Sequence, residues 1–347
     1  MTATLTPPST APQPVAPARR GSLLRAEAHR LWSRRFIRLL VVLGALGFAA
    51  AMALASTQYA QPSAEVTADA QRRLEQVVFE GTAYHQQCLT REVPQGMSAA
   101  DFCGPAPTAE MYGGAEQFID KRPFQLVQEG LTGAGMVAGA TAAFAFLIGA
   151  TWIGAEWSSR SLLALLFWEP RRVRVVGAKL AVLVGATALL AAAAQGVWAV
   201  AARVLASTRG VSAAPPGVAG DLAATAGRGV LLAVLVGLLG FALAHVMRST
   251  AAALGVGFVY FAIVESAVRG VRPAWQEWLL TNNAAALVQE GGGTYYVYEQ
   301  FFDADGVFQY TDREVVVSNL HGGVVLTVVV LLAVGIGTLL FSRRDLT

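Results

Sequence analysis

Six long runs without a charged residue constrain this chain more than any other feature of its sequence. They span residues 39–64, 130–155, 180–202, 229–247, 249–264 and 315–342. A helix needs about 20 residues to cross the hydrocarbon core of a bilayer, where every backbone polar group has to be hydrogen-bonded within the protein. The fifth run is the shortest, and it reaches spanning length only if the helix continues past Glu265.

One such run could also be a buried helix in the core of a soluble protein. Six runs separated by polar segments argue against that interpretation, and so does the content of charged residues. The chain is only 14% charged, whereas soluble domains are about 25% charged. We therefore expect an all-α, polytopic membrane protein with six transmembrane helices.

The distribution of charge predicts the orientation. With six spans, the termini and the connections on the N-terminal side of the membrane carry most of the Lys and Arg residues, and the other side carries most of the Asp and Glu residues. Basic residues in short loops stay in the cytoplasm. We expect a protein of the cytoplasmic membrane with both termini in the cytoplasm. The net charge of +3 gives no reason to expect a nucleic-acid partner.

The N-terminal segment divides into two parts. Residues 1–20 are rich in Pro, Ala and Thr and are expected to be a disordered cytoplasmic tail. Residues 22–36 predict an amphipathic helix in the membrane interface, with Ser22 as N-cap; the alternative is a simple extension of the first span into water. Its apolar face would hold Leu24, Ala28, Leu31, Trp32 and Phe36. The pair Arg34-Arg35 before an apolar run also resembles a signal peptide, but the preceding segment and the run are both too long, so no cleavage is expected.

The first external segment, residues 57–128, is enlarged. It contains a predicted helix over 65–79 and both cysteines of the chain, Cys88 and Cys103. On the oxidising face of the membrane these cysteines are expected to form a disulfide. Two free thiols are the alternative, and a metal site is less favoured because His85 has no further ligand pair nearby.

The second external segment, residues 269–318, is enlarged as well. Residues 274–288 predict an amphipathic helix whose Trp275 and Trp278 dip into the outer leaflet. Residues 295–302 and 307–317 then predict a β-hairpin with a turn at Asp305-Gly306. The same turn faintly resembles a calcium loop, but the further ligands of such a loop are missing.

The cytoplasmic connection between the second and third spans, residues 156–179, carries the strongest functional signal. A short apolar helix over 161–168 is stopped by Pro170 and followed by a basic cluster. Exposed Leu, Phe and Trp side chains on the aqueous side need a covering partner. The partner is either the membrane surface or a groove of another protein.

This connection resembles the permease subunits of ABC-2 type ABC transporters. In that family a Glu at the inner end of the second span precedes a Gly-Thr-Leu-like triplet, and an apolar run, a Pro with basic residues and a Lys entering the third span follow. The matching residues here are Glu156, Ser161-Leu162, Leu165-Leu166, Pro170-Arg171-Arg172 and Lys179. Arg160 stands where the family usually has Gly.

The resemblance covers most of the chain after residue 20. It includes the six spans, an N-terminal interfacial helix that contains Glu27, outer helices before the last span and the basic end Arg343-Arg344-Asp345. It implies that residues 21–347 form one ABC-2 type transmembrane domain. Both external segments are longer than the family layout requires.

The resemblance also implies a role for residues 156–179. They would be the coupling segment, docking into a separate ATP-binding subunit that binds ATP and Mg²⁺. Apolar contacts would come from Leu162, Leu165, Leu166 and Phe167, while Arg171 and Arg172 would meet acidic groups or phospholipid. Glu156 would pair with Lys179 or Arg174, or be an ordinary charged helix end. The spans would pair with a second copy or a homologous permease, and export is the expected direction.

The sequence offers no catalytic site of its own. It has no G-x-x-x-x-G-K-[ST] loop, no H-E-x-x-H motif and no paired carboxylates. We therefore expect neither an enzyme nor a bound cofactor or metal. Two ionisable residues near membrane depth are noted: His245, expected at an inner helix end, and Glu265, a candidate for the transport pathway. A sensory or regulatory membrane protein and an intramembrane enzyme remain as alternatives.

Overall fold

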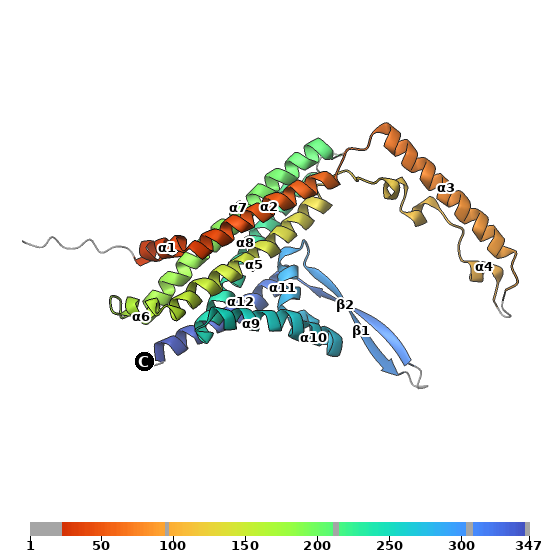
Figure 1. The fold of residues 1–347 in the computed structure, drawn as a ribbon. Coiled ribbons are helices and arrows are strands. Elements are labelled where there is room, and N and C mark those ends of the chain that lie inside the picture. The colour runs from red at the N-terminus through yellow and green to blue at the C-terminus, as the bar shows by residue number, and fades with distance from the viewer. Residues whose placement is uncertain (1–22, 94–96, 211–214, 303–307, 344–347) are drawn as a thin grey trace, which may run out of the picture.

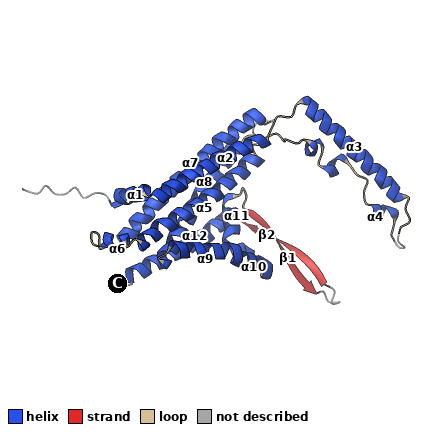
Figure 2. Cartoon of the chain, in the orientation of Figure 1, coloured by secondary structure: helices blue, strands red, loops and turns tan. Residues whose placement is uncertain are grey.

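A computed structural model describes residues 23–93, 97–210, 215–302 and 308–343 (Figure 1). Six of its helices are long and apolar enough to cross a membrane, which confirms a multi-pass membrane protein. They are α2 (Arg35–Gln58), α5 (Gln128–Ser158), α7 (Arg172–Arg209), α8 (Val218–Met247), the continuous helix Thr250–Val271 and α12 (Asn319–Arg343). Within these described ranges, all regular structure is helical apart from one two-stranded sheet (Figure 2).

The fifth span does continue past Glu265. It consists of α9 (Thr250–Val259), a π-helical stretch η3 (Tyr260–Val264) and α10 (Glu265–Val271). This continuation supplies the length that the charge-free run alone lacks.

Helices α5 and α8 form the centre of the bundle, and glycines set their distance. A Cβ atom at Gly149 would collide with the carbonyl oxygen of Gly237, and one at Gly240 with that of Phe146. Small residues of this kind let two membrane helices approach backbone to backbone. Helix α2 lies at the periphery, where Leu39, Val42 and Leu43 are exposed.

Two features extend from one end of the bundle (Figure 1). The first is an arm made of α3 (Ala64–Leu89), α4 (Ala99–Cys103), η1 (Ala109–Tyr112) and η2 (Ala115–Phe118). Its long helix starts at the N-cap Ser63, whose side chain accepts a hydrogen bond from the Val66 amide, and it runs ten residues beyond the predicted end at Phe79. Cys88 and Cys103 form a disulfide that ties the end of α3 to α4.

The second feature is a β-hairpin of β1 (Gly293–Phe302) and β2 (Phe308–Val317). The strands are antiparallel, in a register from Gly293 opposite Val317 to Phe302 opposite Phe308. The predicted turn at Asp305-Gly306 lies outside the described residues. The prediction of one helix over 274–288 is wrong: the extended backbone of Leu279 separates η4 (Pro273–Trp278) from α11 (Leu280–Val288).

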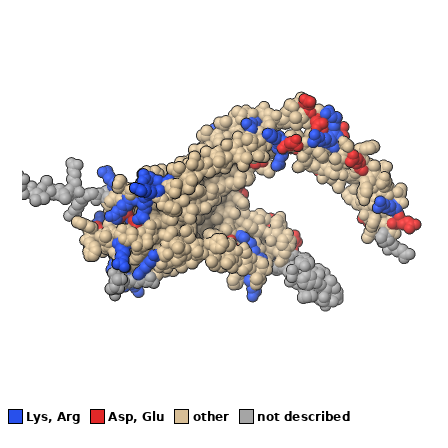
Figure 3. All heavy atoms as spheres, in the orientation of Figure 1, with Lys and Arg blue, Asp and Glu red and all other residues tan. Residues whose placement is uncertain are grey.

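At the opposite end of the bundle lie α1 (Leu23–Ser33), α6 (Ser161–Leu166) and the C-terminal end of α12 (Figure 1). We call this the α6 end and the other the arm end. Basic side chains gather at the α6 end, and the middle of the bundle shows almost none (Figure 3). Residues 1–20, the predicted N-cap Ser22 and the C-terminal Arg344-Asp345 lie outside the described residues.

Candidate functional site

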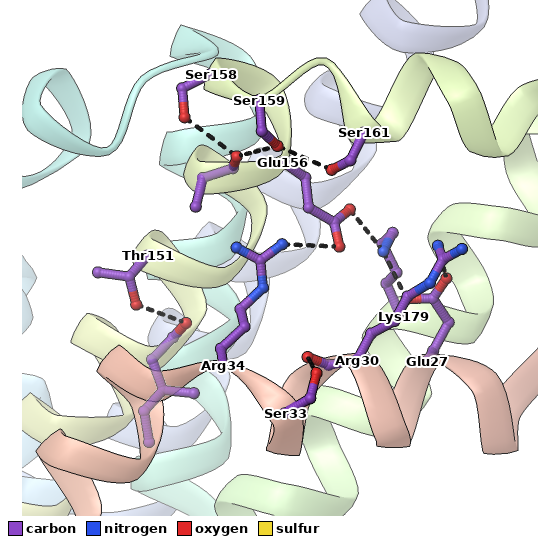
Figure 4. A network of polar contacts seen from close by, with 12 residues as sticks. Glu27, Arg30, Ser33, Arg34, Thr151, Glu156, Ser158, Ser159, Ser161 and Lys179 are labelled. Carbon is purple, nitrogen blue, oxygen red and sulfur yellow. Dashed lines mark hydrogen bonds and ion pairs between the residues drawn. The ribbon is translucent and has the colours of Figure 1, made fainter.

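A buried ion cluster joins three helices at the α6 end (Figure 4). Lys179 on α7 is fully buried, and its Nζ atom lies 2.6 Å from Oε2 of Glu27 on α1 and 2.7 Å from Oε2 of Glu156 on α5. Both carboxylates are buried too. The lysine therefore holds the N-terminal helix and the end of the second span against the start of the third.

Two arginines complete this cluster at its rim. Arg30 lies 3.3 Å from Oε1 of Glu27, and Arg34 lies 3.3 Å from Oε1 of Glu156. Each carboxylate thus meets two cations. Charges are costly to bury unless they are paired and hydrogen-bonded, and in this cluster three cations face two carboxylates.

The pairing explains what Glu156 does. Of its two expected partners it contacts Lys179, whereas Arg174 forms a 3.3 Å ion pair with Glu169. The expectation of an ordinary helix end does not fit a carboxylate with this degree of burial. The sequence did not identify Glu27 as the partner; the only signal was one acidic residue within an arginine-rich amphipathic segment.

The turn between α5 and α6 has an unusual backbone. Arg160 adopts the left-handed conformation, with φ 54° and ψ 13°, which favours glycine. This is the position where the resemblance leads us to expect Gly, and the backbone of Arg160 has a conformation that glycine adopts easily. The hydroxyl of Ser159 bonds to Ala155 O (2.8 Å) and lies 3.0 Å from that of Ser161, the exposed first residue of α6.

Helix α6 ends at Leu166, two residues before the predicted end, and its side chains point in two directions. Leu162 and Leu165 are buried in the core of this chain together with Trp152 and Val176. The sequence predicted that these leucines contact a partner; in this structure their three-residue spacing places both on the inward face of α6. Leu166 is half-buried.

The exposed apolar surface comes from the residues that follow the helix. Phe167 is 89% and Trp168 90% exposed, and the exposed Pro170 follows. Arg171 is exposed as well. We call Phe167 and Trp168 the aromatic tip.

Arg172 contacts the end of the last span. Its Nη1 atom donates to the carbonyl oxygen of Phe341 (2.9 Å), and the guanidinium lies over the Phe341 ring at 5.8 Å. A cation at the last carbonyls of a helix interacts favourably with the helix dipole. Arg172 thus joins the start of α7 to the end of α12.

An aromatic cluster around His245 connects the same region to α8. The indole Nε1 of Trp157 donates to His245 Nδ1 (3.3 Å), Phe241 stacks on the imidazole at 5.7 Å, and Phe341 packs edge-on at 5.1 Å. Arg248 lies over the Trp157 ring at 4.8 Å. His245 is therefore a packed, buried side chain at its helix end, and the ends of α5, α8 and α12 are held as one unit.

Glu265 does not line an open space. It is fully buried, and its carboxylate accepts hydrogen bonds from the Thr281 amide (3.0 Å) and the Thr281 hydroxyl. Arg269 adds an ion pair at 3.2 Å. In this structure the carboxylate satisfies the free Thr281 amide at the start of α11. A role of Glu265 in a transport pathway stays a prediction.

The base of the arm is held by contacts that could not be predicted from the sequence. The Tyr59 hydroxyl donates to Glu129 (2.8 Å), and burial together with this bond raises the pKa of Tyr59 to about 12. Arg209, at the end of α7, donates to the carbonyl oxygens of Ser56 and Tyr59. The arm-end termini of α2, α5 and α7 are therefore joined.

Within the described part of the chain, no three His, Cys, Asp or Glu side chains lie together as a metal site would need. Comparisons of this chain with protein-family models, with curated proteins and with solved structures found no match.

Proposed function

We propose that this chain is the permease subunit of an ABC transporter of the ABC-2 type, driven by a separate ATP-binding subunit. The observation that carries the proposal is the aromatic tip. Two large aromatic side chains stand almost fully exposed next to a short helix whose Leu162 and Leu165 are buried in the bundle. Exposed apolar side chains of this kind favour a protein partner.

The contacts beneath α6 support a role in transmitting force. Glu156 lies five residues before the start of α6, and Lys179 connects it to α7 and, through Glu27, to α1. Arg172 and the His245 cluster extend the connection to α12 and α8. These contacts join five helices (α1, α5, α7, α8 and α12) beside α6, and in this proposal a push on the aromatic tip is passed on to them through α6.

In this proposal the α6 end is cytoplasmic, and α1 lies in the membrane interface. The arginines near both chain ends and around α6 agree with that orientation. A cysteine introduced at the exposed Ser161, in a variant without the native cysteines, should react with an impermeant maleimide only from the cytoplasmic side. Reaction from the outside would contradict the orientation and the transporter assignment with it.

Co-purification tests the partner. The chain is expressed with a candidate ATP-binding subunit that carries a Walker A motif, and Phe167→Asp and Trp168→Asp are compared with Phe79→Asp. Phe79 is a matched control, because it is a highly exposed aromatic residue on the arm. We expect the first two variants to lose the ATPase and the control to retain it.

Equal retention in all three variants would contradict docking through the aromatic tip. An activity that persists without any ATPase would instead favour a sensory or regulatory protein or an intramembrane enzyme. The transport substrate can be identified by screening for compounds that stimulate ATP hydrolysis by the purified complex.

A further inference from the structure

A groove of about 380 Å³ lies beside the ion cluster, where α1 passes into α2. It is lined by Arg34, Arg35, Phe36, Ile37, Thr151, Ala155 and Thr250. We call it the headgroup groove. It is separate from the aromatic tip, and its residues need no ATP-binding partner to bind a ligand.

The position of the groove relative to the membrane follows from the helices that border it. Arg35 is the first residue of the span α2, and Thr250 is the first residue of the fifth span. Two membrane helices thus begin at this groove, which places it at the boundary between the hydrocarbon core and the headgroups. Gly154 allows the close approach, because a Cβ at this position would collide with Thr250.

One side of the groove is strongly positive. Arg34 and Arg35 both line it, and Nη2 of Arg34 lies 3.3 Å from Oε1 of Glu156 (Figure 4). The N-terminus of α2 adds to this charge, since Arg34 occupies the N-cap position and provides no side-chain cap. Uncapped amides at a helix start and arginine guanidinium groups both favour a phosphate group.

The lining of the groove also has an apolar part. Phe36, Ile37 and Ala155 contribute to its lining, so a ligand that has both a phosphate and a hydrocarbon chain fits better than inorganic phosphate alone. The neighbouring cluster supports an anion as well, because its three cations exceed its two carboxylates by one charge.

We propose that the headgroup groove binds a phospholipid, with its phosphate between Arg34 and Arg35 and the start of an acyl chain along Phe36 and Ala155. The lipid phosphate would meet the arginine that also binds Glu156. The lipid composition of the membrane would then act on the contacts that hold α1 to the bundle.

The test uses the full chain, purified in detergent, stripped of lipid and titrated with phosphatidylglycerol. Native mass spectrometry gives the dissociation constant of the first bound lipid. We expect Arg35→Gln to weaken it at least about tenfold, as for the loss of a charged hydrogen bond. Arg38→Gln is the matched control: Arg38 is exposed and lies three residues further along α2, but it does not line the groove.

A second variant leaves the charge unchanged. Ala155→Leu narrows the apolar part of the groove and should weaken binding of the first lipid by a similar factor. Thermal unfolding of this variant checks that the bundle is intact. The control Arg38→Gln should change the dissociation constant of the first lipid by less than about threefold. Equal weakening by Arg35→Gln and Arg38→Gln would show only general attraction to the basic end and would overturn the proposal.

A competition experiment distinguishes a phospholipid from inorganic phosphate as the ligand of the groove. Inorganic phosphate at concentrations above those of the lipid should leave phosphatidylglycerol bound, because inorganic phosphate has no hydrocarbon chain that could contact the apolar part of the groove. Displacement of the lipid by inorganic phosphate would overturn the assignment to a phospholipid and indicate a soluble phosphate ligand.

Discussion

The Nζ atom of Lys179 lies 2.6 Å from Oε2 of Glu27, so the N-terminal helix is bound to the third span by an ion pair without access to water. The two residues are 152 positions apart in the sequence. An amphipathic helix held only by the membrane interface could leave the bundle easily. This pair instead makes α1 part of the bundle.

Removing the lysine should be strongly destabilising. Lys179→Met leaves the carboxylates of Glu27 and Glu156 buried without their shared cation, and we expect a loss of about 3–5 kcal/mol in the free energy of unfolding. Equilibrium unfolding of the purified protein in mixed micelles measures this change in the free energy of unfolding. The control Arg30→Met, at the exposed rim, should cost less than about 1 kcal/mol. Adding Glu27→Gln and Glu156→Gln to Lys179→Met should recover part of the loss; no recovery would argue against unpaired charge as the cause.

Glycine at position 160 should stabilise the chain. Arg160 has a positive φ, which is costly for residues with a side chain, so Arg160→Gly should raise the free energy of unfolding by about 0.5–1 kcal/mol. Arg171→Gly removes an equally exposed arginine at a φ of −79° and should not stabilise. The same unfolding measurement compares the two. A lower stability of Arg160→Gly would mean that the left-handed turn is wrong.

The inward and outward faces of α6 should respond differently to the same change. Leu165→Asp places a carboxylate in the core and should greatly reduce the yield of folded, monodisperse protein. Phe167→Asp alters an exposed side chain and should shift the free energy of unfolding by less than about 0.5 kcal/mol. Size-exclusion chromatography and unfolding curves measure both effects. Comparable damage from the two variants would contradict the orientation of α6.

The disulfide should stabilise the arm and not the bundle. Cys88 and Cys103 enclose a loop with a sequence separation of 15, for which chain entropy predicts about 3 kcal/mol. We expect Cys88→Ser with Cys103→Ser to make the arm sensitive to limited proteolysis, while the thermal unfolding of the bundle stays unchanged. Proteolysis that begins within the spans of the double variant would show that the arm supports the bundle.

The spans could be predicted because their signal is local. The length of a charge-free run decides by itself whether a helix can span the bilayer, and the six runs correspond to the six long apolar helices. Even the extension of the fifth span past Glu265 followed from the length requirement. The hairpin strands were also predicted, since their aromatic and β-branched residues carry a local preference.

The candidate site could be predicted only in part, because its geometry depends on distant residues. The sequence offered Lys179 as a partner of Glu156, but it could not place Glu27 beside both. It also could not tell which face of α6 turns inward. Leu162 and Phe167 are equally apolar in the sequence, and only the packing of α5 and α7 decides that one is covered and the other exposed.

Helix α5 has a consequence for how the two ends of the molecule communicate. It is a single helix of 31 residues without proline, and at 1.5 Å per residue it is about 46 Å long. Glu129 in its first turn binds Tyr59 at the arm, and Glu156 in its last turn binds Lys179 beside α6. The two carboxylates therefore sit on one stiff rod, and an axial displacement imposed at either end arrives at the other without a hinge to absorb it.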